Sequence, residues 1–175
     1  MIEIPLTKGQ IALIDDADQD LVCSYKWYAH SHKNHFSFYA ATRPIRQGPI
    51  LFMHCLLGGK GWDHVNGNGL DNRRFNLRPA TVSQNNSNRP AARGSSSKYL
   101  GVSVDRTRCQ WRAQISVDTH GISLGRFDTE QSAALAYDQA ARQYHGEFAW
   151  LNSDHFEELQ NKEYQGAFSY PQRPL

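Results

Sequence analysis

The sequence predicts an α+β protein, and three observations support this class. Residues 1–52 contain short apolar stretches separated by turns, which is typical of a β-rich region. Residues 99–127 alternate apolar and polar side chains, as the strands of an antiparallel sheet do. Residues 129–145 instead place small and aromatic side chains at helical spacing. We therefore expect a three-stranded antiparallel sheet packed on one helix in the second half of the chain.

Length and composition limit the architecture. A chain of 175 residues that is 39% hydrophobic can form one medium domain or two small ones around modest cores. We expect neither a membrane-spanning segment nor a signal peptide. The cysteines, Cys23, Cys55 and Cys109, are isolated in the sequence. This pattern predicts no disulfide framework, no structural zinc and a reducing cytoplasm as the location.

Charge is distributed unevenly, although the net charge is only +2. Residues 1–22 hold five acidic side chains against one lysine, and the tail after Asn152 is acidic again. Between these ends, residues 72–98 contain no acidic side chain. The basic side chains of that stretch are Arg73, Arg74, Arg78, Arg89, Arg93 and Lys98. Such a distribution indicates that the middle of the chain binds a polyanion.

The segment from Trp62 to Pro90 carries a dense set of turn and helix signals. A short strand begins at Trp62, and the doubled Asn-Gly pair at 66–69 predicts a tight reversal. Residues 76–78 open the returning strand. Residues 81–84 match a helix capping box, so a helix should begin near position 82, and Pro90 limits it to about two turns.

Several side chains of this segment suit phosphodiester hydrolysis. His64 is the natural general base, because the ordinary pKa of histidine lies near neutrality. The carboxylate of Asp63 and the amide oxygen of Asn85 are hard donors suited to one Mg²⁺, for which Mn²⁺ can substitute. Asn76 is a candidate for orienting the loop or the His64 ring. Adjacent strand residues face opposite ways, so Asp63 and His64 can share a site only if the strand bends or ends there.

In this order and spacing the segment resembles the HNH endonucleases, particularly the phage and intron-encoded homing type. The matching motifs are D-H at 63–64, N-G-x-x-x-D-N-R at 66–73, N-L-R at 76–78 and S-Q-N at 83–85. The upstream residues 53–57 resemble the family's M-H-R-L-I lead-in, with Cys55 where arginine is common. The family's third signature position is often histidine, and here it is Asn85.

The resemblance implies a ββα-metal core over residues 53–89. It implies His64 as the base, Asp63 and Asn85 as metal ligands, and Asn76 as the middle asparagine. The implied substrate is double-stranded DNA. One metal centre implies nicking by a monomer, or cleavage of both strands through a dimer or a second event.

Residues 90–97 read as a basic linker, and residues 98–152 resemble the APETALA-type (ethylene-response-factor-like) DNA-binding domain. The matching motifs are Y-L-G-V, W-R-A-Q-I, L-G-R-F-D-T, A-A-L-A-Y-D-Q-A-A and H-G-E-F-A-x-L-N. The resemblance implies a sheet that enters a DNA groove. The expected DNA contacts in this domain are Arg106, Arg108, Arg112 and Gln114. Residues 153–175 should form a peripheral tail.

Two other readings stay open at this point. The chain could be a non-catalytic DNA-binding regulator on a nuclease scaffold. It could also be a phage protein that acts on a host protein, with the acidic residues 1–22 imitating DNA. The histidines of a predicted hairpin tip, His30, His32 and His35, lack a carboxylate or cysteine partner in the sequence, so we interpret them as surface residues. A phage-encoded enzyme would act in the cytoplasm of the host bacterium.

Overall fold

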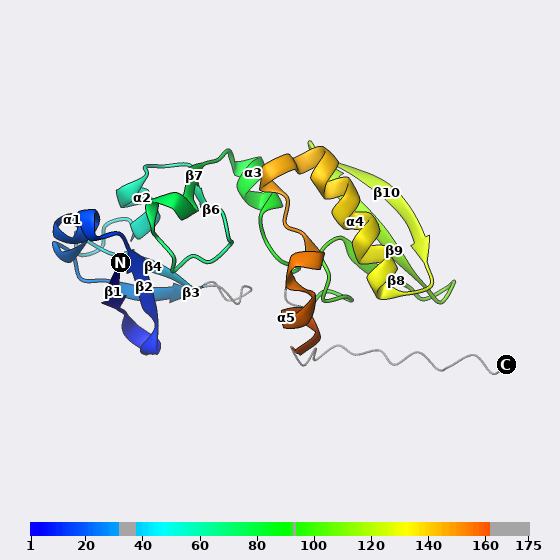
Figure 1. Ribbon diagram of the computed structural model, residues 1–175, viewed down its shortest axis with the longest axis horizontal. Helices are drawn as coiled ribbons and strands as arrows, with labels where there is room; N and C mark the ends of the chain where they lie inside the picture. Colours follow the sequence, from blue (N-terminus) through cyan, green and yellow to red (C-terminus); the bar gives the residue numbers. More distant parts are fainter. Residues whose placement is uncertain (32–37, 93, 162–175) are drawn as a thin grey trace. The chain divides into compact units, whose positions relative to one another are not determined.

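The computed structural model describes residues 1–31, 38–92 and 94–161, and the chain divides into two compact units, Met1–Asn86 and Ser87–Leu175 (Figure 1). His32, His35 and Arg93 lie outside the described residues. Small antiparallel sheets and a few helices make up both units, which confirms the predicted α+β class. None of the described helices is long and apolar enough to cross a membrane.

In the described part of the first unit, three small antiparallel sheets have the orders β1–β2, β3–β4–β5 and β6–β7. Its strands are β1 (Ile2–Pro5), β2 (Ile11–Ile14), β3 (Tyr28–Ser31), β4 (Phe38–Thr42), β5 (Leu51–Phe52), β6 (Trp62–His64) and β7 (Leu77–Pro79). Its α-helices are α1 (Gln19–Cys23), α2 (Met53–Leu57) and α3 (Val82–Ser87), the last of which ends at the boundary of the units. Short 3₁₀ turns are η1 (Thr7–Gly9), η2 (Asp16–Asp18) and η3 (Arg74–Asn76).

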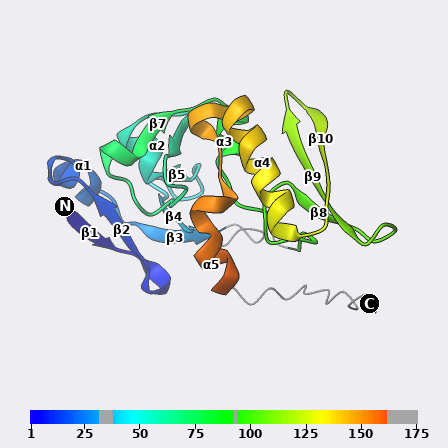
Figure 2. The same ribbon diagram turned by 45° about the vertical axis from the view of Figure 1, so that its right-hand side comes forward.

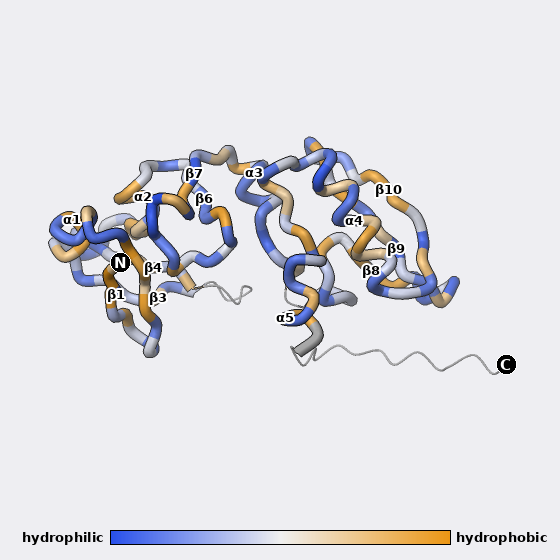
Figure 3. Tube along the Cα trace, viewed as in Figure 1, coloured by the Kyte–Doolittle hydropathy of each residue, from blue (hydrophilic) through white to orange (hydrophobic). Residues whose placement is uncertain are grey.

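One apolar core joins these elements. Its buried residues are Ala12, Ile14, Val22, Trp27, Ala40, Met53, Leu57 and Leu77. Leu77 anchors β7 in this core, and the hydrophobic stretches of β1 and β2 are visible in orange in Figure 3. The main chain of Leu13 also holds the loop after β6, since its N–H donates to Leu70 and its carbonyl accepts from the N–H of Asn72, both at 2.8 Å. The loop is therefore fixed from the β2 side as well as by its own strands.

Helix α3 begins as the sequence predicts. The N–H of Gln84 donates to Oγ1 of Thr81 at 3.2 Å, and the N–H of Thr81 donates to Oε1 of Gln84 at 2.8 Å. This reciprocal pair is a capping box and satisfies two main-chain donors at the helix start. The helix follows β7 directly, so strand β6, strand β7 and helix α3 are consecutive along the chain.

The second unit has a sheet of order β10–β9–β8 with α4 against one face, as Figures 1 and 2 show from two directions. Its elements are β8 (Val102–Asp105), β9 (Gln110–Val117), β10 (His120–Phe127), α4 (Glu130–His145) and α5 (Phe156–Asn161), with 3₁₀ turns η4 (Gly146–Phe148) and η5 (Asn152–His155). The predicted alternation in β9 is confirmed, because Ala113 and Ile115 are buried while Arg112 and Gln114 are exposed. Thr129 caps α4 by accepting from the N–H of Ser132.

A buried polar contact joins Leu100, which precedes β8, to Asn152, which follows α4. The side chain of Asn152 accepts from the N–H of Leu100 at 2.8 Å and donates to its carbonyl at 3.1 Å. Asp138 on α4 accepts from both nitrogens of Asn152. Because Leu100 makes these bonds, β8 begins at Val102, later than the predicted start at Tyr99.

Candidate active site

Asp63 and His64 are the last two residues of β6, and both are buried, with 6% and 4% of their surfaces exposed. In the register with β7, Asp63 lies opposite Arg78 and His64 lies opposite Leu77. The strand ends at His64 and the chain turns at once. This meets the condition under which consecutive strand residues can serve one site.

The loop after β6 is held by the buried side chain of Asn76. Its Oδ1 accepts from the N–H of Asn66 at 3.0 Å, and its Nδ2 donates to Oδ1 of Asn66 at 3.0 Å and to the carbonyl of Asp71 at 2.7 Å. Nδ2 of Asn66 in turn donates to Oδ2 of Asp71 at 3.2 Å. A buried group left without its partner costs about 1–3 kcal/mol, so this amide strongly favours one loop conformation.

The His64 ring is oriented by Asn72, a fully buried residue that sequence reasoning did not single out. Nε2 of His64 lies 3.2 Å from Oδ1 of Asn72, and Nδ2 of Asn72 donates to the carbonyl of Leu70. That second bond assigns the Asn72 oxygen to the histidine side, so Nε2 carries the hydrogen and donates. In this neutral tautomer Nδ1 of His64 is the ring atom that can accept a proton.

His54 on α2 is the nearest aromatic neighbour of His64, and sequence reasoning also missed its role. The two ring centroids lie 4.9 Å apart in an edge-to-face arrangement, and Phe52 stacks on His54. Tyr39 of β4 packs against both histidines. Burial, with a smaller contribution from His64, lowers the pKa of His54 to about 4. Burial also lowers the pKa of His64, while Asn72, Asp63 and Asp71 oppose the shift.

Asp63 faces a positive charge in this structure. Nη2 of Arg78 lies 3.3 Å from Oδ2 of Asp63, and both side chains are largely buried. Arg78 therefore reaches the carboxylate that was predicted to hold a metal.

Asn85, the other predicted ligand, is exposed on α3. Among the described residues, no cluster of three His, Cys, Asp or Glu side chains could hold a metal ion. The predicted site consists of one carboxylate and one amide, so it does not depend on such a cluster. The role of Asn85 stays a prediction.

The other predicted DNA contacts of the first unit, Arg73 and Arg74, pair with carboxylates. Arg73 makes two 2.7 Å hydrogen bonds to Asp71, through Nε and Nη2. Arg74 pairs with Asp18, and its N–H donates to Asp15 at 2.8 Å. Part of the acidic N-terminal segment is thus used to fix the turn before β7.

The predicted DNA contacts of the second unit lie in different surroundings. Arg112 and Gln114 project from the exposed face of β9, and Arg126 of β10 lies directly opposite Arg112 in the register. Strand alternation in L-G-R-F-D-T could have identified Arg126 from the sequence. The remaining predicted contacts are Lys98, which lies 5.3 Å from the Tyr99 ring; Arg108, which pairs with Asp105 at 3.7 Å; and Arg89 and Arg106, which are exposed.

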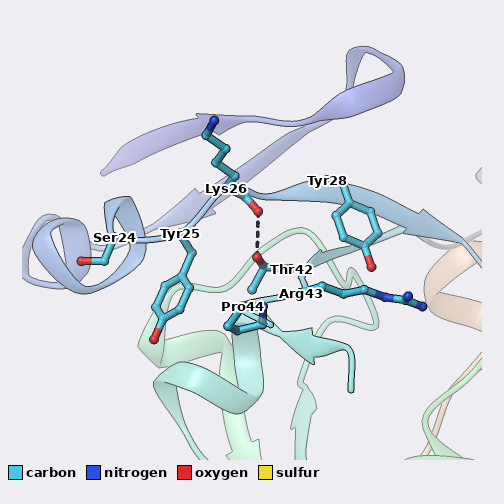
Figure 4. A pocket seen from close by; sticks show the side chains of 7 residues that line it. All are labelled: Ser24, Tyr25, Lys26, Tyr28, Thr42, Arg43 and Pro44. Carbon is cyan, nitrogen blue, oxygen red and sulfur yellow. Dashed lines mark hydrogen bonds between the residues drawn. The ribbon is translucent and has the colours of Figure 1, made fainter. Parts of the chain in front are cut away.

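A hollow of about 410 Å³ in the first unit is separate from these residues. Tyr25, Tyr28 and Thr42 are among the residues that line it. The Thr42 hydroxyl donates to the Lys26 carbonyl at 2.8 Å, and Figure 4 marks this bond with a dashed line. The predicted site residues do not line it.

Comparison with known proteins gives three informative relatives. The chain is 30% identical over 157 residues to a protein of Acanthamoeba polyphaga mimivirus described as an uncharacterized HNH endonuclease, which covers 85% of this chain and 78% of that protein. It is 27% identical over 127 residues to Protein 3.8 of Escherichia phage T7, covering 72% of this chain and 95% of that one. It is 47% identical over 60 residues to dehydration-responsive element-binding protein 2D of Arabidopsis thaliana, covering 33% and 29%.

The mimivirus relative matches along most of both chains, so this chain belongs to the HNH endonuclease family. The likeness to the plant protein is partial, because it covers a third of the chain. No family model and no solved structure matches the chain.

The lowered pKa of His54 predicts a pH dependence of stability. Between pH 6.5 and about 4 the unfolded chain carries the proton on this residue and the folded chain does not. The contribution of His54 is therefore complete above pH 6.5 and is lost as the pH falls toward 4. At pH 5 the loss amounts to about 2 kcal/mol, at about 1.4 kcal/mol per pH unit.

An NMR titration of the ring Cε1–H signal measures this directly. We expect a midpoint near pH 4 for His54, with His54→Phe identifying the signal by its loss. A midpoint at or above pH 6.5 would show that His54 is not buried against His64 as described.

Proposed function

We propose that this protein is a metal-dependent DNA endonuclease of the homing type that nicks duplex DNA, with β6, β7 and α3 as its ββα-metal core. The observation that carries the proposal is the buried Asp63–His64 pair at the end of β6, held beside the Asn76 loop in a chain of the HNH family.

In this proposal His64 is the general base. Its Nε2–H is engaged with Asn72, so Nδ1 takes the proton of the attacking water. Burial favours the neutral ring, which is the form that can accept this proton. Asn76 acts as a positioning residue, because it fixes the loop that carries Asn72.

Asp63 and Asn85 would hold one Mg²⁺, with Mn²⁺ as a possible substitute. The donor set fits, since a carboxylate and an amide supply only oxygen ligands. The 3.3 Å contact of Asp63 with Arg78 is longer than the usual charge-assisted hydrogen bond of about 2.7–2.9 Å. When bound, the metal would neutralise charge on the phosphate and on the leaving oxygen. Arg78 would contact the same phosphate.

The second unit would hold the duplex as an APETALA-type domain. Support comes from the partial likeness to a plant protein named as a dehydration-responsive element-binding protein, and from the exposed face that carries Arg112, Gln114 and Arg126. One face of the sheet is covered by α4, which leaves the other open to a DNA groove. The relative from phage T7 supports a phage-encoded enzyme acting in the bacterial cytoplasm.

Nicking of supercoiled plasmid tests the proposed centre. With Mg²⁺ the wild type should convert plasmid to open circles, and EDTA should stop it. His64→Ala should lower the rate about 100-fold or more, because a positioned general base contributes at least that factor. His120→Ala removes an exposed histidine of the second unit and should leave the rate unchanged. Equal cleavage by His64→Ala would contradict the assignment, and no cleavage by wild type with Mg²⁺ or Mn²⁺ would favour the DNA-binding regulator.

The second unit is tested by the DNA concentration that gives half-maximal nicking. Arg112→Gln should raise this concentration several-fold and lower its salt dependence, without changing the maximal rate, because a phosphate contact is lost. Arg142→Gln changes an exposed arginine on α4 instead and serves as the matched control. The same shift in both variants would mean that the sheet face has no special part in binding.

A further inference from the structure

Phe75 is a large aromatic side chain that the fold leaves in solvent. It lies in η3, the turn before β7, with 71% of its surface exposed. Removing an apolar ring from water is favourable, so Phe75 gains free energy when a partner covers it.

The turn that presents Phe75 is held by ion pairs and by a backbone hydrogen bond. On one side Arg73 makes its two bonds to Asp71, and on the other Arg74 pairs with Asp18. The N–H of Asn76 closes the turn by donating to the carbonyl of Arg73 at 2.9 Å. Arg73 and Arg74 thus hold the backbone of the turn. Phe75, which lies between Arg74 and Asn76, is exposed to solvent.

One face of the ring is already occupied. The guanidinium of Arg73 lies 4.6 Å from the centroid of the Phe75 ring, in a cation–π contact. This contact limits the rotamers of Phe75 and leaves the opposite ring face open. A preorganised ring loses little conformational entropy when it inserts into a partner.

The turn that carries Phe75 is bonded to the end of the strand that carries the proposed catalytic residues. The N–H of Val65, the residue after His64, donates to the carbonyl of Asn76 at 2.8 Å. Val65 is itself 44% exposed. Two apolar side chains therefore flank the end of the strand that carries Asp63 and His64. In the proposed function a phosphodiester would approach His64 at this end of the strand, and its neighbouring sugars and bases would then meet the apolar pair.

We propose that Phe75 is a wedge that inserts between base pairs of the bound duplex and unstacks one step next to the scissile phosphate. This inference rests on the proposed function, because it takes duplex DNA as the substrate. Apolar side chains inserted at a base step kink and unwind DNA, which opens the groove and brings more of the backbone to the protein. Phe75 is therefore a positioning residue for the strand to be cut.

Unwinding can be measured without knowing the target site. The inactive His64→Ala protein is bound to a nicked circular plasmid, ligase seals the circle, and the topoisomers are separated after the protein is removed. Three further proteins carry a second change, Phe75→Ala, Phe75→Trp or Ile45→Ala, and all are compared at equal occupancy from gel shifts. Ile45 is the matched control, because it is also 71% exposed and lies elsewhere in the first unit.

We expect His64→Ala to lower the linking number in proportion to bound protein. Phe75→Ala should abolish at least half of this shift, while Phe75→Trp and Ile45→Ala retain it. An equal shift with Phe75→Ala, or DNA binding by the parent without any shift, would overturn the wedge. An apolar partner other than DNA would then be the alternative use of Phe75. Since no cleavage is involved, a wild type that fails to nick plasmid would reject the nuclease proposal and leave this result intact.

Discussion

The buried side-chain amide of Asn76 is the contact on which the site depends most. Its bonds to Asn66 and Asp71 close the loop after β6, and Asp71 in turn holds Arg73. The same loop carries Asn72, which orients His64. One amide therefore connects the orientation of the proposed base with the turn that exposes Phe75, and backbone bonds from Leu13 hold the loop from the outside.

Ion pairing separates the arginines into structural and accessible groups. Asp71, Asp18 and Asp63 accept from Arg73, Arg74 and Arg78 respectively, and their carboxylates are nearly buried. An arginine in such a pair must give up a carboxylate before it can contact a phosphate, which costs free energy. In the second unit Arg126 also pairs with a carboxylate, that of Asp105 at 2.8 Å, but 42% of its side chain stays exposed. It lies opposite Arg112, which projects from the exposed face of β9. Catalysis and duplex binding are thus proposed for different units.

Local patterns could be predicted from the sequence, and long-range contacts could not. The capping box at Thr81 and the alternation of β9 depend on nearby residues, and both are confirmed. The Arg74–Asp18 pair joins residues 56 positions apart, so the sequence could not show that an arginine of the acid-free basic stretch pairs with the acidic N-terminal segment. His54 was missed for the same reason, since only the packing of α2 brings it to His64.

The central claim is that Asp63 and Asn85 hold a divalent metal beside His64, and Mn²⁺ binding followed by electron paramagnetic resonance tests it most directly. We expect one Mn²⁺ bound per wild-type chain and an affinity lowered about tenfold or more by Asp63→Asn or Asn85→Ala, since even outer contacts of metal sites are worth that much. Asn86→Ala changes the neighbouring exposed asparagine and should bind as wild type does. Unchanged Mn²⁺ affinity in Asp63→Asn would contradict the account.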